Sequence, residues 1–177
     1  MQEIFNKLNY TFSVAPNGLV GINSRAEKLK SLLAVEPNDV RIIGIWGMGG
    51  MGKTTLARVV YGMISNQLEA CSFIPNVREK SEKGKLLKLQ KKLLEELLMG
   101  GDMKIQDVDH GVLIIKNRLH NKKILLILDA VYNSYQLEKL ARKNWFGLGS
   151  RVLITTGERS LLVTHEVNEI YEIEALN

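Results

Sequence analysis

Short apolar runs alternate with amphipathic stretches along this chain of 177 residues. The runs have the length and the β-branched residues of buried strands, whereas the stretches between them repeat apolar residues at helical spacing. We expect strands at Arg41–Trp46, Cys71–Ile74, Ile124–Leu128 and Arg151–Thr155, with Ile170–Ile173 as a candidate last strand. Strands that alternate with helices favour a mainly parallel sheet between two helical layers, a three-layer α/β/α fold.

Apolar faces and capping residues predict the helices. Ser24 and Glu27 form a capping box, which predicts a helix from Ser24 to about Val35 that ends near Pro37. Further helices are expected at Lys53 to about Asn66, at Lys85–Met99, after Asp107 or Asp109 as the cap, and at Tyr135–Arg142. Residues 1–20, with the turn signal Pro16-Asn17-Gly18, are expected to be a tether that enters a domain of residues 21–177.

The leucines of residues 85–99 form one helical stripe. Its members are Leu86, Leu89, Leu93 and Leu97, widened by Leu94 and Leu98. A coiled coil needs about three or four heptads, and this stripe covers only about two. We therefore expect the stripe to pack into the core of the domain.

Composition and charge narrow the class of function. Cys71 is the only cysteine, which fits a reducing compartment such as the cytoplasm. The longest strongly apolar stretch, Ile124–Leu128, is too short to cross a bilayer. The net charge is +5, but acidic and basic residues are interleaved, and the densest basic run, Arg78 to Lys92, has no aromatic residues to stack bases. Neither a membrane nor a nucleic acid is an expected partner.

The strongest chemical signal is the loop that follows the first strand. Residues 47–54, Gly-Met-Gly-Gly-Met-Gly-Lys-Thr, match the P-loop pattern G-x-x-x-x-G-K-[ST]. The glycines let the main chain approach phosphates closely, and successive N–H groups with the start of a helix make an anion site. Lys53 would place a cation on the β- and γ-phosphates. We expect a purine nucleoside di- or triphosphate to be bound by Gly47, Gly49, Gly50, Met51, Gly52, Lys53, Thr54 and Thr55.

The same glycines also fit the dinucleotide pattern G-x-G-x-x-G. That pattern requires an acidic residue about 20 positions further on, at the end of the second strand, to bind a ribose. Here the second strand ends at Ile74-Pro75-Asn76, and Glu69 lies before the strand. The P-loop interpretation is therefore favoured, because it also explains the Lys53-Thr54 pair.

A second acidic element fits a bound metal. Asp129 follows the apolar run Ile124–Leu128, where P-loop enzymes place an acid for Mg²⁺. We expect Thr54 and Asp129 to hold Mg²⁺, Asp129 through a water; the alternative is that Asp129 only caps the following segment. Hydrolysis also needs a group that orients or deprotonates the attacking water. The next residue is Ala130, whose methyl group cannot accept a proton.

Together these motifs resemble the NB-ARC module of plant nucleotide-binding leucine-rich-repeat disease-resistance receptors, in particular the type preceded by a TIR domain. The matching segments, in family order, are Leu19–Arg25, Gly44–Thr55, Phe73–Glu79, Ile124–Asp129 and Trp145–Thr156. The resemblance implies a P-loop NTPase fold and an innate-immune switch that holds ADP at rest, exchanges it for ATP when triggered, and then oligomerises with other receptor chains. It also implies that Val20, Gly21 and Ile22 lie against the adenine.

Two departures from the family fall on hydrolysis and on sensing of the terminal phosphate. The family usually has two acidic residues where this chain has Asp129-Ala130, and an arginine where this chain has Gly157, with Arg159 two positions further on. The chain also ends at Asn177, before the helical and winged-helix subdomains of the family, so we expect a fragment or a truncated relative.

These features predict a module that binds ADP or ATP with Mg²⁺ and hydrolyses little or none, and no catalytic residue is assigned. Two alternatives stay open: a competent P-loop ATPase, and an interaction module that binds full-length receptors without nucleotide.

Overall fold

The computed structural model describes residues 16–34, 38–81, 84–101 and 103–174. In these residues, five parallel strands form one sheet in the order β2-β3-β4-β1-β5. The strands are β1 (Arg41–Trp46), β2 (Ala70–Ile74), β3 (Ile124–Val131), β4 (Arg151–Thr156) and β5 (Glu169–Glu172). The predicted three-layer α/β/α fold with a parallel sheet is confirmed.

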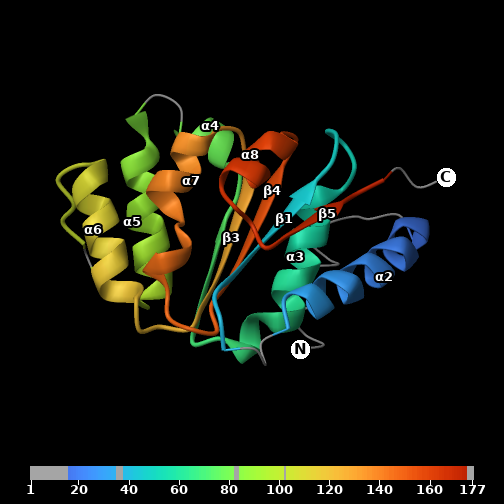
Figure 1. The fold of residues 1–177 in the computed structure, drawn as a ribbon, viewed down its shortest axis with the longest axis horizontal. Coiled ribbons are helices and arrows are strands. Elements are labelled where there is room, and N and C mark those ends of the chain that lie inside the picture. The colour runs from blue at the N-terminus through green and yellow to red at the C-terminus, as the bar shows by residue number, and fades with distance from the viewer. Residues whose placement is uncertain (1–15, 35–37, 82–83, 102, 175–177) are drawn as a thin grey trace.

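Helices cover both faces of this sheet (Figure 1). On one face lie α2 (Pro16–Leu32) and α3 (Lys53–Ile64), which continues into a 3-10 turn at Ser65–Gln67. The other face carries α4 (Val77–Ser81), α5 (Leu86–Leu97), α6 (Val108–Leu119), α7 (Ser134–Leu140), a 3-10 turn at Lys143–Trp145, and α8 (Arg159–Thr164). Asp107 caps α6 by accepting a hydrogen bond from the His110 N–H at 2.8 Å, which decides between the two predicted caps.

Strand residues alternate between the two helical layers. Leu125 and Ile127 pack with α2 and α3, whereas Ile124, Leu126 and Leu128 pack with the helices of the opposite face. An uninterrupted apolar run is stable only where both faces of a strand are covered, as they are here. The predicted leucine stripe of α5 packs with Ile124, Leu126 and Leu128 on the same face of the sheet, so its role in the core is confirmed.

The start of the first described helix differs from the prediction. Pro16-Asn17-Gly18 lies inside α2 and is not a turn, so Ser24 and Glu27 stand within the helix and do not cap its start. Proline is favourable in the first turn of a helix, because its missing N–H has no intrahelical partner there. Residues 1–15 of the predicted tether, and the predicted helix end near Pro37, lie outside the described residues.

Gln90 of α5 connects three helices through its buried side chain. Its Nε2 donates to the Val108 carbonyl at 3.0 Å and to the Lys139 carbonyl at 2.9 Å. Gly111 of α6 leaves room for this carboxamide, since a Cβ at that position would overlap Gln90 Oε1.

Gly111→Ala is therefore expected to destabilise the fold. Overpacking of this kind costs about 1–3 kcal/mol, and the better helix propensity of alanine offsets about 1 kcal/mol of it. Urea unfolding measures the difference. Gly157→Ala is the control, because its Cβ would meet only the Gly47 carbonyl at 3.8 Å. Equal stability of the two variants would show that Gln90 moves aside without cost.

Candidate functional site

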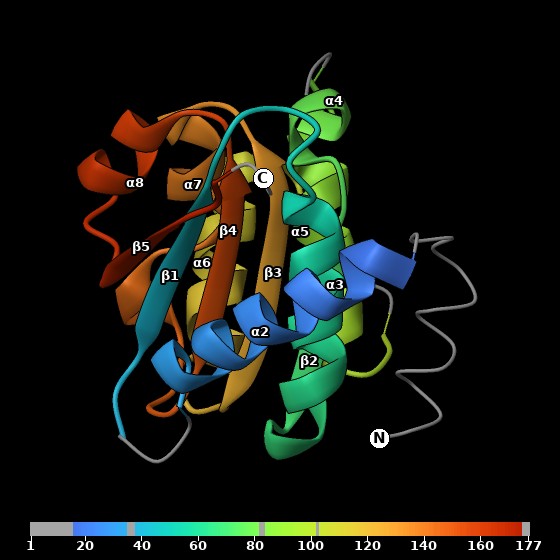
Figure 2. The same ribbon diagram turned by 90° about the vertical axis from the view of Figure 1, so that its right-hand side faces the viewer.

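The carboxyl ends of β1, β3 and β4 lie at one edge of the sheet, beside a cavity of about 660 Å³. In Figure 2 the loop between β1 and α3 arches over this edge. The lining residues come from this loop, from the ends of β3 and β4, and from α4: Gly49–Thr54, Ala130–Tyr132, Thr155–Glu158 and Arg78. The fold therefore brings segments far apart in sequence to one cavity.

The loop has the backbone that its glycines predict. Gly50 and Gly52 have φ of 80° and 82°, a left-handed conformation that other residues adopt only with strain. Gly52 directly precedes α3, and no side chain caps the start of that helix. The first N–H groups of an α-helix have no intrahelical acceptor, so those of α3 are available to an anion in the cavity.

Lys53 holds its ammonium group against the same loop. Its Nζ donates to the Gly47 carbonyl at 2.6 Å and to the Met48 carbonyl at 2.7 Å. Burial lowers the pKa of Lys53, and the negative charge of Asp129 partly opposes this shift. A cation and a row of amide donors thus converge on one end of the cavity.

Thr54 and Asp129, the predicted metal pair, are in direct contact. The Thr54 hydroxyl lies 2.9 and 3.0 Å from the two carboxylate oxygens of Asp129, whose side chain is almost fully buried. Hydroxyl and carboxylate oxygens are the ligands that Mg²⁺ prefers, so this pair fits the ion. The alternative role of Asp129 as a cap is not supported, since Asn133 caps the following helix α7.

Thr155 is a site residue that the sequence reasoning missed. Its hydroxyl donates to Asp129 Oδ1 at 2.7 Å and accepts from the Ala130 N–H at 2.8 Å. Ala130 has φ 58° and lies at a register shift between β3 and β4. Thr155 therefore fixes both the carboxylate and the unusual backbone beside it. Its position at the end of a parallel strand is the signal that could have identified it.

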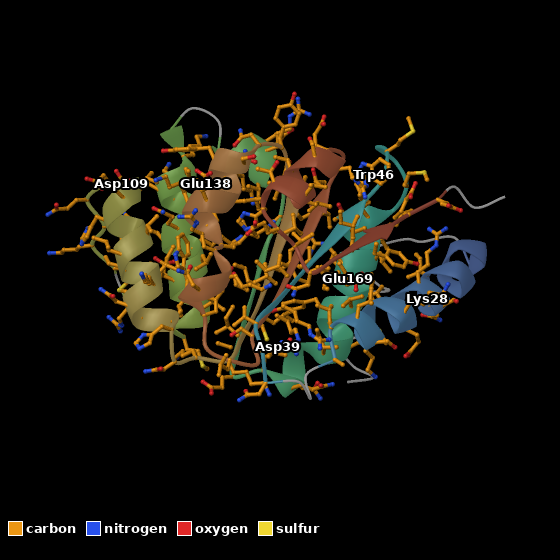
Figure 3. The ribbon with its side chains drawn as sticks, viewed as in Figure 1. Lys28, Asp39, Trp46, Asp109, Glu138 and Glu169 are labelled. Atoms are coloured by element: carbon orange, nitrogen blue, oxygen red, sulfur yellow. The ribbon has the colours of Figure 1, made fainter. Side chains whose placement is uncertain are left out.

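Gly157 has no side chain at the position where the resemblance implies an arginine. It lines the cavity, and its carbonyl accepts a hydrogen bond from Trp46 Nε1 at 3.3 Å. Trp46, labelled in Figure 3, ends β1 and stands directly before the loop. Arg159 begins α8 and is absent from the described lining residues, so it does not replace the missing side chain.

The other predicted contacts fall outside the cavity wall. Gly47 contributes its carbonyl to Lys53, and Thr55 is the third residue of α3. Val20, Gly21 and Ile22 lie within the helix α2. Their contact with adenine stays a prediction. In the described part of the chain, no helix combines the length and apolar character needed to cross a bilayer.

Comparison with known proteins agrees with this geometry. Residues 22–177 match the NB-ARC domain family. The chain is 40% identical over 177 residues to the disease resistance protein RUN1 of Vitis rotundifolia, covering 99% of this chain and 13% of that protein. It is 42% identical over 177 residues to the disease resistance protein RPV1 of the same species, with the same coverage. The chain thus spans about 13% of the length of these two relatives.

A solved structure shares the fold at low sequence identity. The crystal structure of Cdc6p from Pyrobaculum aerophilum superposes with a TM-score of 0.61 at 13% identity, covering 98% of this chain and 49% of that chain. At this level of identity the likeness concerns the fold alone.

Proposed function

Because this chain belongs to the NB-ARC family, we propose that it is the ADP- or ATP-binding switch module of a plant disease-resistance receptor, with little or no hydrolysis of its own. We further propose that this receptor is of the type preceded by a TIR domain and that the module associates with other receptor chains. A cytoplasmic location fits the single cysteine, Cys71.

One observation carries the proposal: Lys53, the start of α3 and the Thr54–Asp129 pair all adjoin one cavity. A polyphosphate is the ligand whose charge and size suit this combination of amide donors, ammonium group and metal-ligand oxygens. Thr54 and Asp129 would hold Mg²⁺, which would neutralise part of the phosphate charge. The adenine contact of Val20, Gly21 and Ile22 belongs to the same proposal.

Calorimetric titration of the chain with ADP, ATP and GTP, each with Mg²⁺, tests the proposal. We expect saturable binding of at least one adenine nucleotide, at one site per chain, and weaker binding in the presence of EDTA. An absence of heat up to about millimolar nucleotide, where the binding free energy is only about −4 kcal/mol, would contradict it and favour a module that binds receptors without nucleotide.

Hydrolysis by the isolated chain is expected to be negligible. Ala130 offers no group to activate water, and Gly157 offers no side chain to the terminal phosphate. Restoring the acid as Ala130→Asp should raise phosphate release about tenfold or more, if this group limits turnover, because a positioned general base contributes about 10²–10⁴-fold. Aspartate also adopts the φ of 58° at this position more readily than alanine does.

A coupled phosphate-release assay measures this effect, and Ala130→Asn is its matched control. Asparagine tolerates the same backbone but cannot take a proton, so it should leave turnover unchanged. Steady phosphate release by the unmodified chain, lost on Lys53→Ala, would instead identify a competent ATPase.

A further inference from the structure

A second cation lines the same cavity as the loop between β1 and α3. Arg78 of α4 lines the cavity together with the loop residues and Gly157. Its guanidinium carbon lies 4.2 Å from the ring centroid of Tyr132, which also lines the cavity and is half exposed. The side chain is thus exposed to the cavity and yet held in place by an aromatic surface.

The short helix that carries Arg78 is well anchored. Val77 is fully buried against β3 and the core, and Ser81 accepts a hydrogen bond from the Gln136 side chain of α7. At its start, Asn76 donates to the Glu79 carboxylate at 2.6 Å. The backbone of Arg78 is therefore fixed relative to the end of β3, where Asp129 lies.

The cations that line the cavity are few for a ligand as strongly charged as a triphosphate. Among the described lining residues the cations are Lys53 and Arg78, and Lys53 already binds two carbonyls of the loop. A triphosphate carries more negative charge than a diphosphate, so its terminal phosphate calls for a further cation. Gly157 supplies no side chain to meet it. Arg78 is the other cation among the described residues that line the cavity.

Stacking suits Arg78 to this task. A guanidinium group that lies over an aromatic ring keeps its N–H donors in its own plane, free to bind two oxygens of one phosphate. We propose that Arg78, supported by Tyr132, binds the terminal phosphate of a nucleoside triphosphate and so distinguishes it from a diphosphate. This inference rests on the proposed nucleotide-binding function and adds to it a residue that determines nucleotide specificity.

Competition titration with a fluorescent ADP analogue tests the inference, using Mg·ADP and a non-hydrolysable Mg·ATP analogue as competitors. Arg78→Ala should weaken the triphosphate about tenfold or more and the diphosphate less than about threefold, because charge-assisted hydrogen bonds to one phosphate are lost. Lys80→Ala is the matched control, since it removes the same charge from the same helix at a position outside the cavity wall. It should change neither affinity by more than about threefold.

Variants of Tyr132 test the supporting surface. Tyr132→Phe keeps the ring and should preserve the preference for triphosphate, whereas Tyr132→Leu should lose part of it. Gly157→Arg in the Arg78→Ala background should restore the preference, because Gly157 lines the cavity and a Cβ there would meet only the Gly47 carbonyl at 3.8 Å. This rescue would not be expected if Arg78 had a merely structural role.

The outcomes separate the two proposals. Equal losses for both nucleotides, or no loss for either, would overturn the role of Arg78 while leaving nucleotide binding intact. Failure of the unmodified chain to bind either nucleotide would overturn the proposed function and this inference with it.

Discussion

Replacing Lys53 with alanine is expected to weaken binding of Mg·ADP by about 10- to 100-fold. Hydrogen bonds from a charged donor contribute about 1.5–3 kcal/mol, and every 1.4 kcal/mol is tenfold in affinity. The Lys53 ammonium is the cation closest to the loop, where its Nζ lies 2.6 Å from the Gly47 carbonyl. Amide groups of the loop and of α3 would remain, so binding should be weakened rather than abolished.

The same substitution also removes two contacts within the loop, to the Gly47 and Met48 carbonyls. Thermal unfolding without nucleotide therefore has to accompany the titration, and it should show a small change, because one of these hydrogen bonds is exposed to solvent and the other only partly buried. Lys28→Ala is the control for net charge; Figure 3 shows Lys28 on α2, away from the loop. Unchanged affinity in the Lys53 variant would mean that nucleotide binds elsewhere.

Much of the fold could be predicted because the signals are local. The run Ile124–Leu128 is apolar without interruption, which by itself indicates a strand covered on both faces. The start of α2 could not be located, because Pro16-Asn17-Gly18 has the composition of a turn although it lies inside the helix. The short helices α4 and α8 were also missed, because so few residues show no reliable period.

The candidate site likewise has one part that the sequence predicts and another that depends on the folded structure. The loop from Gly47 to Thr55 is contiguous, so its residue types and spacing predict its chemistry directly. Thr155 comes from the end of β4 and Arg78 from the short helix α4 that follows β2, so their relation to Asp129 and to the loop depends on strand order and register. The parallel topology predicts that such residues share one edge of the sheet, but side-chain directions there are fixed only by the packed structure.

A second large effect is expected at Arg151, which is fully buried at the opposite end of the sheet. Its guanidinium donates to the Leu33 carbonyl at 3.0 Å and to the Ala34 carbonyl at 2.6 Å, just after the end of α2. It also lies 3.1 Å from the Asp39 carboxylate. Arg151→Met should lower the free energy of unfolding by about 3 kcal/mol or more, because buried carbonyls lose charged donors.

Arg41→Met is the matched control, since Arg41 binds the same carboxylate at 3.0 Å but its side chain is 26% exposed. A partly exposed ion pair contributes about 0–1 kcal/mol, and the further hydrogen bond from Arg41 to the Leu32 carbonyl, at 3.2 Å, about 1 kcal/mol, so this variant should lose clearly less stability than Arg151→Met. Urea unfolding at pH 7 measures both. Equal losses would show that the carbonyls after α2 find other donors when Arg151 is absent.

The dependence on pH provides an independent check. Burial alone would raise the pKa of Asp39, but the hydrogen bond from Arg41 and the charges of Arg151 and Arg41 outweigh it and lower the pKa below its usual value. A carboxyl group with a lowered pKa stabilises the fold above its unfolded pKa of about 3.9, and this share is lost as the pH falls through the lower folded value. The difference in free energy of unfolding between the unmodified chain and Arg151→Met should therefore shrink as the pH falls below 5. The change should be smaller than about 1 kcal/mol, because Asp39 is half exposed. A difference in stability that grows toward acid would contradict the ion pair.

Figure 3 places Asp39 at the other end of β1 from Trp46, so the folded fraction of the Arg151→Met variant should still bind nucleotide with unchanged affinity.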